Sequence, residues 1–119
     1  MAENVIKNKS FAFAIRVVKL YQFLCETKKE FVLSKQLLRS GTAVGALVRE
    51  AEHAESKADF SHKMSIAQKE INENIYWLEL LKETDYLTNE QFQSIYADAV
   101  EIIKLLTSII KSIKANINN

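Results

Sequence analysis

The chain contains no proline, only two glycines and a single cysteine among its 119 residues. Hairpin turns in β-sheets draw heavily on glycine and proline, so a sandwich or barrel with many hairpins is excluded. A single cysteine cannot form an internal disulfide, and residues 1–10 lack the apolar core of a secretory signal. We therefore expect an all-α protein of the reducing cytoplasm.

The composition is that of an ordinary globular protein. Apolar residues make up 48% of the chain and charged residues 26%, with a formal net charge of +1. These proportions exclude a disordered chain and supply enough apolar surface for a core. Polar and charged residues interrupt the longest apolar stretch well short of the roughly 20 residues that cross a bilayer. We expect one domain over residues 1–119 and no membrane partner.

Apolar residues recur at spacings of three and four along four segments, which is typical of amphipathic helices. Ser10 and Ser34 are predicted to cap the first two helices, and Ser56 and Thr88 the last two. Because the links between the segments are short, the sequence predicts an antiparallel up-down-up-down four-helix bundle. The helices are expected at about residues 10–27, 35–55, 57–84 and 89–116.

The first and last helices carry more apolar side chains than one bundle seam requires. In the first helix, Phe11, Ile15 and Val18 are expected to widen the core stripe. In the last helix, a second line of apolar residues runs beside the core stripe and predicts a homo-oligomer. The alternative is a broad core that buries these additional apolar residues within the single chain. Trp77 is either an interface anchor or a boundary residue of its own bundle. The residues expected in an oligomer interface are Trp77, Ile95, Ile102, Leu105 and Ile109.

Patterns of catalytic and cofactor sites are missing from the sequence. There is no G-x-S-x-G elbow and no glycine-rich phosphate loop, and Cys25 is interpreted as a buried structural thiol. Glu50 with His53, and Asp59 with His62, resemble half of a di-metal site, but lysines at this end of the bundle would repel a cation. A solvated turn is the preferred interpretation. We expect no enzyme activity, no metal and no cofactor.

Two glycines lie one turn apart in the second predicted helix, at Gly41 and Gly45. Each costs about 1 kcal/mol relative to alanine in a helix interior. Small neighbours at Ser40, Thr42 and Ala43 extend this surface. The pattern predicts a close helix–helix contact.

Charge is distributed unevenly along the chain. Residues 1–40 carry eight Lys or Arg and three Asp or Glu, a net +5, whereas residues 71–100 carry one and six, a net −5. In an up-down bundle the start of the first helix meets the end of the last, where basic residues would attract a polyanion. The alternative is an ordinary solvated face. The candidate phosphate contacts are Lys7, Lys9, Arg16, Lys19, Lys104, Lys111 and Lys114.

The segment 36–81 reads QLLRSGTAVGALVREAEHAESKADFSHKMSIAQKEINENIYWLELL. It resembles the small bacterial four-helix bundle proteins that are encoded by intervening sequences in 23S ribosomal RNA genes. The resemblance implies a ring-shaped homopentamer without established enzymatic activity. A related branch, the accessory variability determinant proteins of diversity-generating retroelements, implies binding of structured RNA or DNA. The matching positions include Arg39, Ser40, Gly45, Arg49, Glu50, Ser56, Asp59 and Phe60.

The sequence departs from this family's pattern in the second helix. Where the family usually has Asn in a Gly-Ala-Asn-Ile run, this chain has Leu47. We expect a more apolar site there, without any role that the Asn performs. The alternative to nucleic-acid binding is a protein-interaction adaptor, in which apolar grooves or the Trp77 face hold a partner protein.

Overall fold

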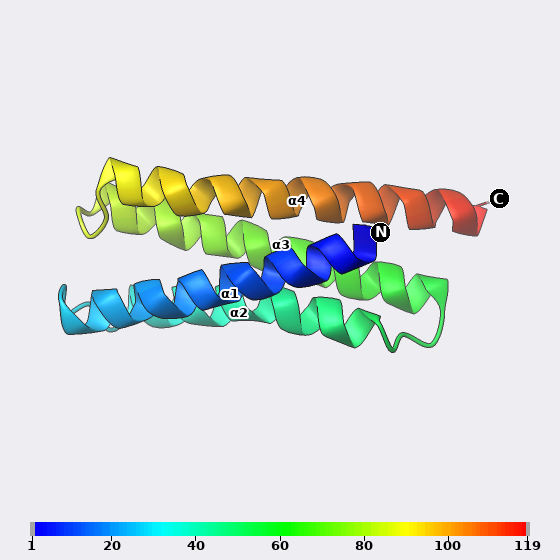
Figure 1. The fold of residues 1–119 in the computed structure, drawn as a ribbon, viewed down its shortest axis with the longest axis horizontal. Helices are drawn as coiled ribbons and strands as arrows, with labels where there is room; N and C mark the ends of the chain where they lie inside the picture. The colour runs from blue at the N-terminus through cyan, green and yellow to red at the C-terminus, as the bar shows by residue number, and fades with distance from the viewer. Residues whose placement is uncertain (1, 119) are drawn as a thin grey trace.

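The computed structural model describes residues 2–118, and side chains over residues 4–116. Four helices follow one another: α1 (Ala2–Glu26), α2 (Leu33–Ala51), α3 (Lys57–Glu83) and α4 (Asn89–Asn118). Each helix packs against its two neighbours in a square, whereas the backbones of the diagonal pairs, over the described residues, lie further apart. Figure 1 shows the resulting antiparallel bundle, which confirms the predicted up-down-up-down arrangement.

The core runs the length of the bundle and takes apolar side chains from all four helices. Spacings of three and four bring these side chains to the inward face of each helix. Burying each stabilises the fold by about 1.5–3 kcal/mol relative to leaving it exposed. Among the largest buried side chains are Phe13, Leu24, Leu37, Met64, Ile71, Leu78, Ile102 and Leu106.

The start of α1 differs from the prediction. The helix begins at Ala2, and Ser10 is a buried residue of its interior, so the predicted cap at Ser10 is wrong. Its hydroxyl donates to the Lys7 carbonyl oxygen at 3.2 Å. The apolar stripe extends back to Ile6, which is fully buried. Burial of Ile6, seven residues before Phe13, holds the added turns against the core.

The start of α2 also differs, because Glu30 and not Ser34 caps it. The Glu30 carboxylate accepts hydrogen bonds from the backbone N–H groups of Val32, Leu33 and Ser34, at 2.9 to 3.0 Å. These bonds satisfy N–H groups that have no partner within the helix. The Ser34 hydroxyl instead donates to the Glu30 carbonyl oxygen at 2.9 Å. At its other end, α2 stops at Ala51, four residues earlier than expected.

The predicted caps of α3 and α4 are confirmed. Ser56 Oγ accepts from the backbone N–H of Asp59 at 3.0 Å. At α4, Thr88 Oγ1 accepts from the Gln91 N–H at 3.1 Å, and Gln91 Oε1 accepts from the Thr88 N–H at 2.9 Å. This reciprocal pair is a capping box.

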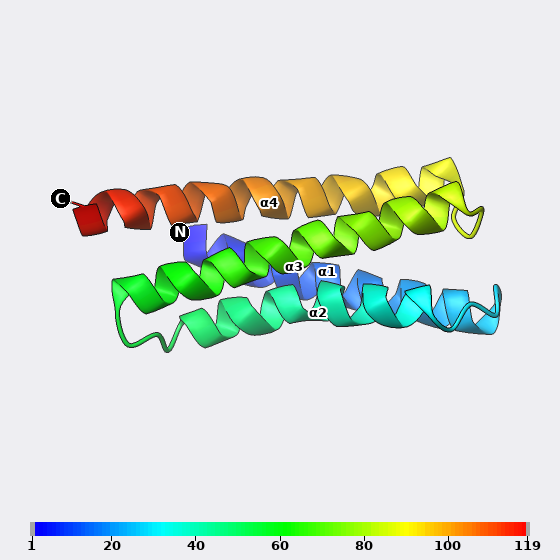
Figure 2. The same cartoon turned by 180° about the vertical axis from the view of Figure 1, so that it is seen from behind.

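The seam between α1 and α4 is the loosest of the four. Figures 1 and 2 show the two helices closest near the start of α1 and diverging toward the α1–α2 turn. None of the four helices, over the residues described, is both long and apolar enough to cross a membrane.

Candidate nucleic-acid interface

The basic residues predicted near the start of α1 are paired with carboxylates outside this helix. Lys7 Nζ lies 3.0 Å from Oε1 of Glu52, the residue that follows α2. Lys9 Nζ lies 3.0 Å from Glu101 Oε1 on α4. Both pairs are partly exposed, so each contributes little to stability, but each offsets a positive charge. This part of α1 therefore presents less free positive charge than its sequence suggests.

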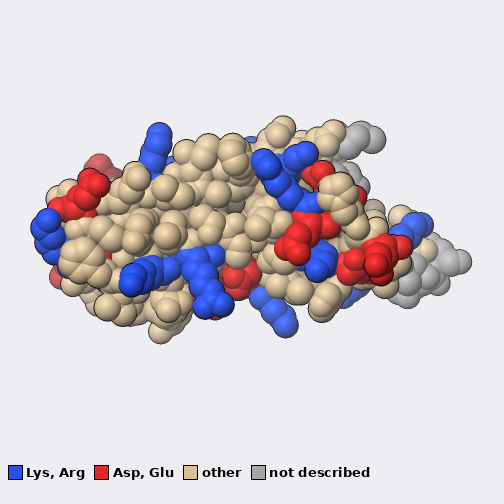
Figure 3. All heavy atoms as spheres, turned by 90° about the horizontal axis from the view of Figure 1, so that it is seen from below, with Lys and Arg blue, Asp and Glu red and all other residues tan. Residues whose placement is uncertain are grey.

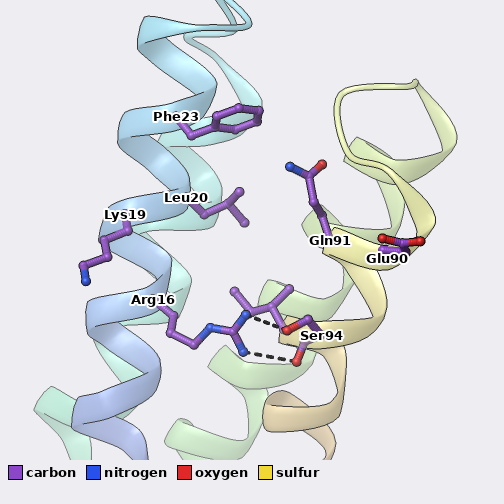
Figure 4. Close-up of a pocket in the computed structure, with 8 residues that line it drawn as sticks. Arg16, Lys19, Leu20, Phe23, Glu90, Gln91 and Ser94 are labelled. Carbon is purple, nitrogen blue, oxygen red and sulfur yellow. Dashed lines mark hydrogen bonds between the residues drawn. The ribbon is translucent and has the colours of Figure 1, made fainter.

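Arg16 is the most constrained of the predicted phosphate contacts. Its Nη1 donates to Asp98 Oδ2 at 2.6 Å and to the Ser94 carbonyl oxygen at 3.1 Å. Its Nη2 donates to Ser94 Oγ at 2.9 Å, and Figure 4 shows the guanidinium reaching across to α4. These bonds tie α1 to α4 across the loosest seam. These bonds use three of the five N–H donors of the guanidinium, and Asp98 offsets its charge, so Arg16 attracts a phosphate less strongly than a free arginine.

A cleft of about 520 Å³ lies beside Arg16 between α1 and α4. Leu20, Phe23 and Ile95 give it an apolar lining. In Figure 4, Leu20, Phe23 and Gln91 point into the cleft, whereas Lys19 points away from it. The Ser94 hydroxyl, which also lines the cleft, accepts a hydrogen bond from Arg16.

Three lysines in the second half of α4 are exposed. No carboxylate of the described residues lies within 4.0 Å of Lys104, Lys111 or Lys114. Lys104 and Lys111 border a shallow groove of about 360 Å³, whose other lining residues are Ile103, Thr107 and Ser108.

The seven predicted phosphate contacts therefore do not form one continuous basic end. Three of them lie in the C-terminal half of α4, namely Lys104, Lys111 and Lys114. Lys19 lies apart from these, on α1. The other three are paired with Glu52, which follows α2, and with Asp98 and Glu101 of α4. The sequence shows the charges of each helix but not which carboxylates of other helices will lie opposite them.

The two carboxylate–histidine pairs do not converge on a cation site. His53 and His62 are both exposed. Among the side chains of residues 4–116, no three His, Cys, Asp or Glu lie close enough together to hold a metal ion. Glu50 Oε1 instead lies 3.7 Å from Lys63 Nζ, in an ion pair between α2 and α3.

Cys25 was expected to be a buried thiol, but it is only half-buried.

A buried polar cluster between α2 and α3 was not predicted. Asn74 is fully buried, and its Nδ2 donates to the Leu37 carbonyl oxygen at 3.0 Å and to Ser40 Oγ at 3.2 Å. A Cβ on Gly41 would lie 2.8 Å from this nitrogen and 2.7 Å from Val17. The predicted close helix contact at Gly41 is therefore confirmed. The sequence feature that could have predicted this cluster is Asn74 itself, a single Asn within the apolar stripe of α3.

Several positions that carry the resemblance stabilise the bundle. A Cβ on Gly45 would lie 3.4 Å from the Ser10 carbonyl oxygen, so α1 and α2 approach closely there. The Arg49 guanidinium lies 4.9 Å from the centre of the Phe11 ring, a cation–π contact between the same helices. Asp59 Oδ2 accepts from the Glu55 N–H at 3.2 Å.

Two further matching positions, and the position where the chain departs from the family, lie on α2 and α3. Phe60 and Leu47 are half-buried and pack against the core, so the leucine that replaces the family's Asn is part of the apolar interior. Arg39 is exposed and close to Glu70. Burial raises the pKa of Glu70, the nearby Glu73 raises it further, and Arg39 partly opposes this shift.

The residues expected in an oligomer interface occupy two different environments. Ile95, Ile102 and Ile109 are only 3%, 1% and 5% exposed within the single chain. They fill its own core, so the apolar surplus of α4 is absorbed there and these three offer almost no surface to a second copy. Leu105 and Trp77 are half-buried and keep part of their surface.

The exposed apolar surface lies on α1 instead. Phe11, Ile15 and Val18 were expected to widen the core stripe, but they are 52%, 42% and 37% exposed. They lie on the side of α1 that faces away from the core, which Phe13 and Val17 occupy. On α3, Tyr76 is 58% exposed and was not singled out from the sequence.

The fold defines a small all-α four-helix bundle with exposed apolar and basic side chains. A family model described as 23S rRNA-intervening sequence protein matches residues 2–108, and the chain belongs to this family. It is also similar to a protein of unknown function from the S23 ribosomal protein family of Bacteroides thetaiotaomicron VPI-5482, known from a crystal structure. The two are 60% identical with a TM-score of 0.92, over 93% of this chain and 99% of the other. A search of curated proteins gives no match.

Proposed function

We propose that this protein is a non-catalytic homo-oligomer, a pentamer as the family resemblance implies, that binds structured RNA or DNA through the lysines of α4. One observation carries this proposal. Lys104, Lys111 and Lys114 are exposed on one helix, and no carboxylate of the described residues offsets their charge. Lysines in this state bind phosphate without displacing an existing partner.

The spacing of these lysines suits a phosphate backbone. Ten residues of helix place Lys104 and Lys114 about 15 Å apart along the axis. One strand of a duplex carries a phosphate about every 3.4 Å along its axis, so the three ammonium groups span several phosphates. Lysine contacts to phosphate fix position without reading sequence. Each added copy of the chain repeats the set and raises the local potential for a polyanion.

Charge reversal on α4 tests this assignment. We expect the double variant Lys111→Glu with Lys114→Glu to bind a labelled RNA hairpin at least about tenfold more weakly. The slope of log K against log salt should become shallower by about 1.8, because two phosphate contacts are lost. Fluorescence anisotropy titrations over a salt series measure both quantities.

The matched control reverses two exposed lysines outside α4, Lys28→Glu with Lys35→Glu. It changes the net charge by the same amount, and we expect it to weaken binding much less. Equal losses in the two double variants would mean that net charge alone attracts the RNA, and would contradict a site on α4.

A protein-interaction adaptor is the second candidate function. The observation that favours it is the α1–α2 turn, where Phe31 and Val32 are 53% and 73% exposed. A partner held by apolar contacts binds with little dependence on salt, whereas phosphate binding weakens steeply as salt rises. The same salt series therefore separates the two functions.

A further inference from the structure

Hydroxyl groups lie between two of the lysines that carry the proposed function. The groove of about 360 Å³ on α4 is lined by Ile103, Lys104, Thr107, Ser108 and Lys111, and we call these residues the α4 groove. Spacings of three and four residues bring side chains to one side of a helix, so the lysines and the hydroxyls share one surface. Lys104 and Lys111 lie about 10.5 Å apart along the axis, with the hydroxyls midway between them.

Negative charge is absent from the part of the sequence that forms this surface. Residues 102–119 include three lysines and no acidic side chain. Figure 3 shows the contrasting α1–α2 side of the bundle, where Lys and Arg near the α2–α3 turn lie among Asp and Glu. Lys7, for example, is paired there with Glu52. The α4 groove therefore presents its positive charge without carboxylates of its own segment.

The Thr107 hydroxyl is positioned by a contact with α3. Gln68 Nε2 donates to Thr107 Oγ1 at 2.8 Å, so this oxygen already accepts a hydrogen bond. A hydroxyl group has one hydrogen to donate in addition to its acceptor sites. The contact with Gln68 holds the oxygen in place and leaves its hydrogen for a ligand in the groove.

The Ser108 hydroxyl is exposed and is not bonded to its own helix. Ser and Thr side chains within helices often donate to a carbonyl oxygen of the preceding turn. Ser40 and Thr42 of α2 do so, at 2.9 and 2.8 Å. Over the residues that the structure describes, Ser108 makes no such bond. Its hydroxyl can therefore both donate a hydrogen bond to a ligand and accept one.

This order of lysines and hydroxyls matches the backbone of RNA. A sugar lies between successive phosphates of a nucleic-acid strand, so a strand with phosphates at the two lysines has sugars over the two hydroxyls. The ribose of RNA carries a 2′-hydroxyl that donates and accepts hydrogen bonds, whereas the deoxyribose of DNA lacks this group. Ser and Thr side chains are among those that bond to the sugar–phosphate backbone. Ile103 offers apolar surface to the C–H groups of the sugar.

We propose that the α4 groove binds RNA in preference to DNA, through hydrogen bonds between ribose 2′-hydroxyl groups and the side chains of Thr107 and Ser108. This inference rests on the proposed function and names the nucleic acid that the lysines of α4 hold. The lysines bind the phosphates of either nucleic acid, and the hydroxyls distinguish the two sugars. Because all of these contacts are to the backbone, the preference is independent of base sequence.

Three labelled hairpins of one sequence test this preference by fluorescence anisotropy. The first is RNA, the second is DNA, and the third is 2′-fluoro RNA, which keeps the A-form geometry of RNA but lacks the hydroxyl. One hydrogen bond of ordinary strength changes an equilibrium constant about fivefold. We expect the unmodified protein to bind the RNA hairpin at least about fivefold more tightly than either of the others.

Removal of the two protein hydroxyls should abolish the preference. We expect the double variant Thr107→Val with Ser108→Ala to bind the three hairpins with affinities within about twofold of one another. The slope of log K against log salt should stay unchanged, because the lysines are intact. The matched control, Thr107→Ser with Ser108→Thr, alters the same two positions but keeps both hydroxyls, so it should retain the preference for RNA.

Circular dichroism checks that each variant is folded. Thr107→Val removes the acceptor of the Gln68 amide, whereas Ser108→Ala alters only an exposed side chain. If the double variant unfolds, Ser108→Ala alone replaces it. We expect this single substitution to weaken binding of the RNA hairpin about fivefold and to leave binding of the DNA hairpin unchanged.

Three results would overturn this inference while the proposed function stands. Equal affinity of the unmodified protein for RNA and DNA would mean that the groove binds phosphate alone. If 2′-fluoro RNA binds as tightly as RNA, the protein recognises the geometry of the duplex and not the hydroxyl. If the variants without hydroxyls keep the preference, residues outside the α4 groove contact the ribose. Absence of binding to all three hairpins at about 50 mM salt would contradict the proposed function as well.

Discussion

Gly41 and Gly45 lie one turn apart on α2, but their surroundings differ. A Cβ on Gly41 would lie 2.7 Å from both γ-carbons of Val17, whereas on Gly45 the nearest atom is 3.4 Å away. We expect Gly41→Ala to lower the free energy of unfolding by about 1–3 kcal/mol, because the core must shift. Gly45→Ala should be neutral or stabilising by up to about 1 kcal/mol, because alanine favours the helix.

Urea denaturation followed by circular dichroism measures both substitutions and allows each glycine to serve as the control for the other. Equal effects of the two would contradict the close approach of Val17 and Asn74 to Gly41. From the sequence, both glycines predicted a helix contact. Their difference depends on partners in α1 and α3, which local spacing does not identify.

The polar contacts of single residues were predicted only where both partners are close in sequence. The Ser56 and Thr88 caps bond to residues three positions away, and both were found. Asn74 bonds to residues 34 and 37 positions away, and its role emerged only from the fold. Glu30 lies close to its partners, but rules for helix caps favour shorter side chains.

At the scale of whole elements, the apolar spacing predicted the number and order of the helices, and errors were confined to their ends. The helix start at Ala2 yields a test. Because Ser10 lies inside α1, we expect Ser10→Ala to change the free energy of unfolding by no more than about 0.5 kcal/mol, since its hydroxyl bonds only within its own helix. Ser56→Ala, which removes a true cap, should cost about 1 kcal/mol.

Thermal or urea unfolding of the two serine variants checks this difference. A cost at Ser10 equal to that at Ser56 would indicate that the helix starts near Ser10, as its sequence alone suggests. The reason for the longer helix is Ile6, which extends the buried stripe by two turns beyond Phe13.

For the molecule as a whole, the sequence predicted the bundle better than its surfaces. The apolar lines of α4 were recognised, but only the fold decides that Ile95, Ile102 and Ile109 enter the core while Phe11, Ile15 and Val18 stay outside. Likewise, the charge counts located the basic segments. They did not reveal that Glu52, Asp98 and Glu101 neutralise three of the predicted phosphate contacts.

The most direct test of nucleic-acid binding is a fluorescence anisotropy titration of a labelled, structured RNA hairpin with the unmodified protein. Between about 50 and 200 mM salt, three phosphate contacts predict a loss of affinity of roughly 40-fold, and contacts from further copies increase it. Binding with this salt dependence is the result that we expect. No binding at 50 mM salt, or an affinity that salt leaves unchanged, would contradict the proposed function and favour an adaptor that binds a partner protein.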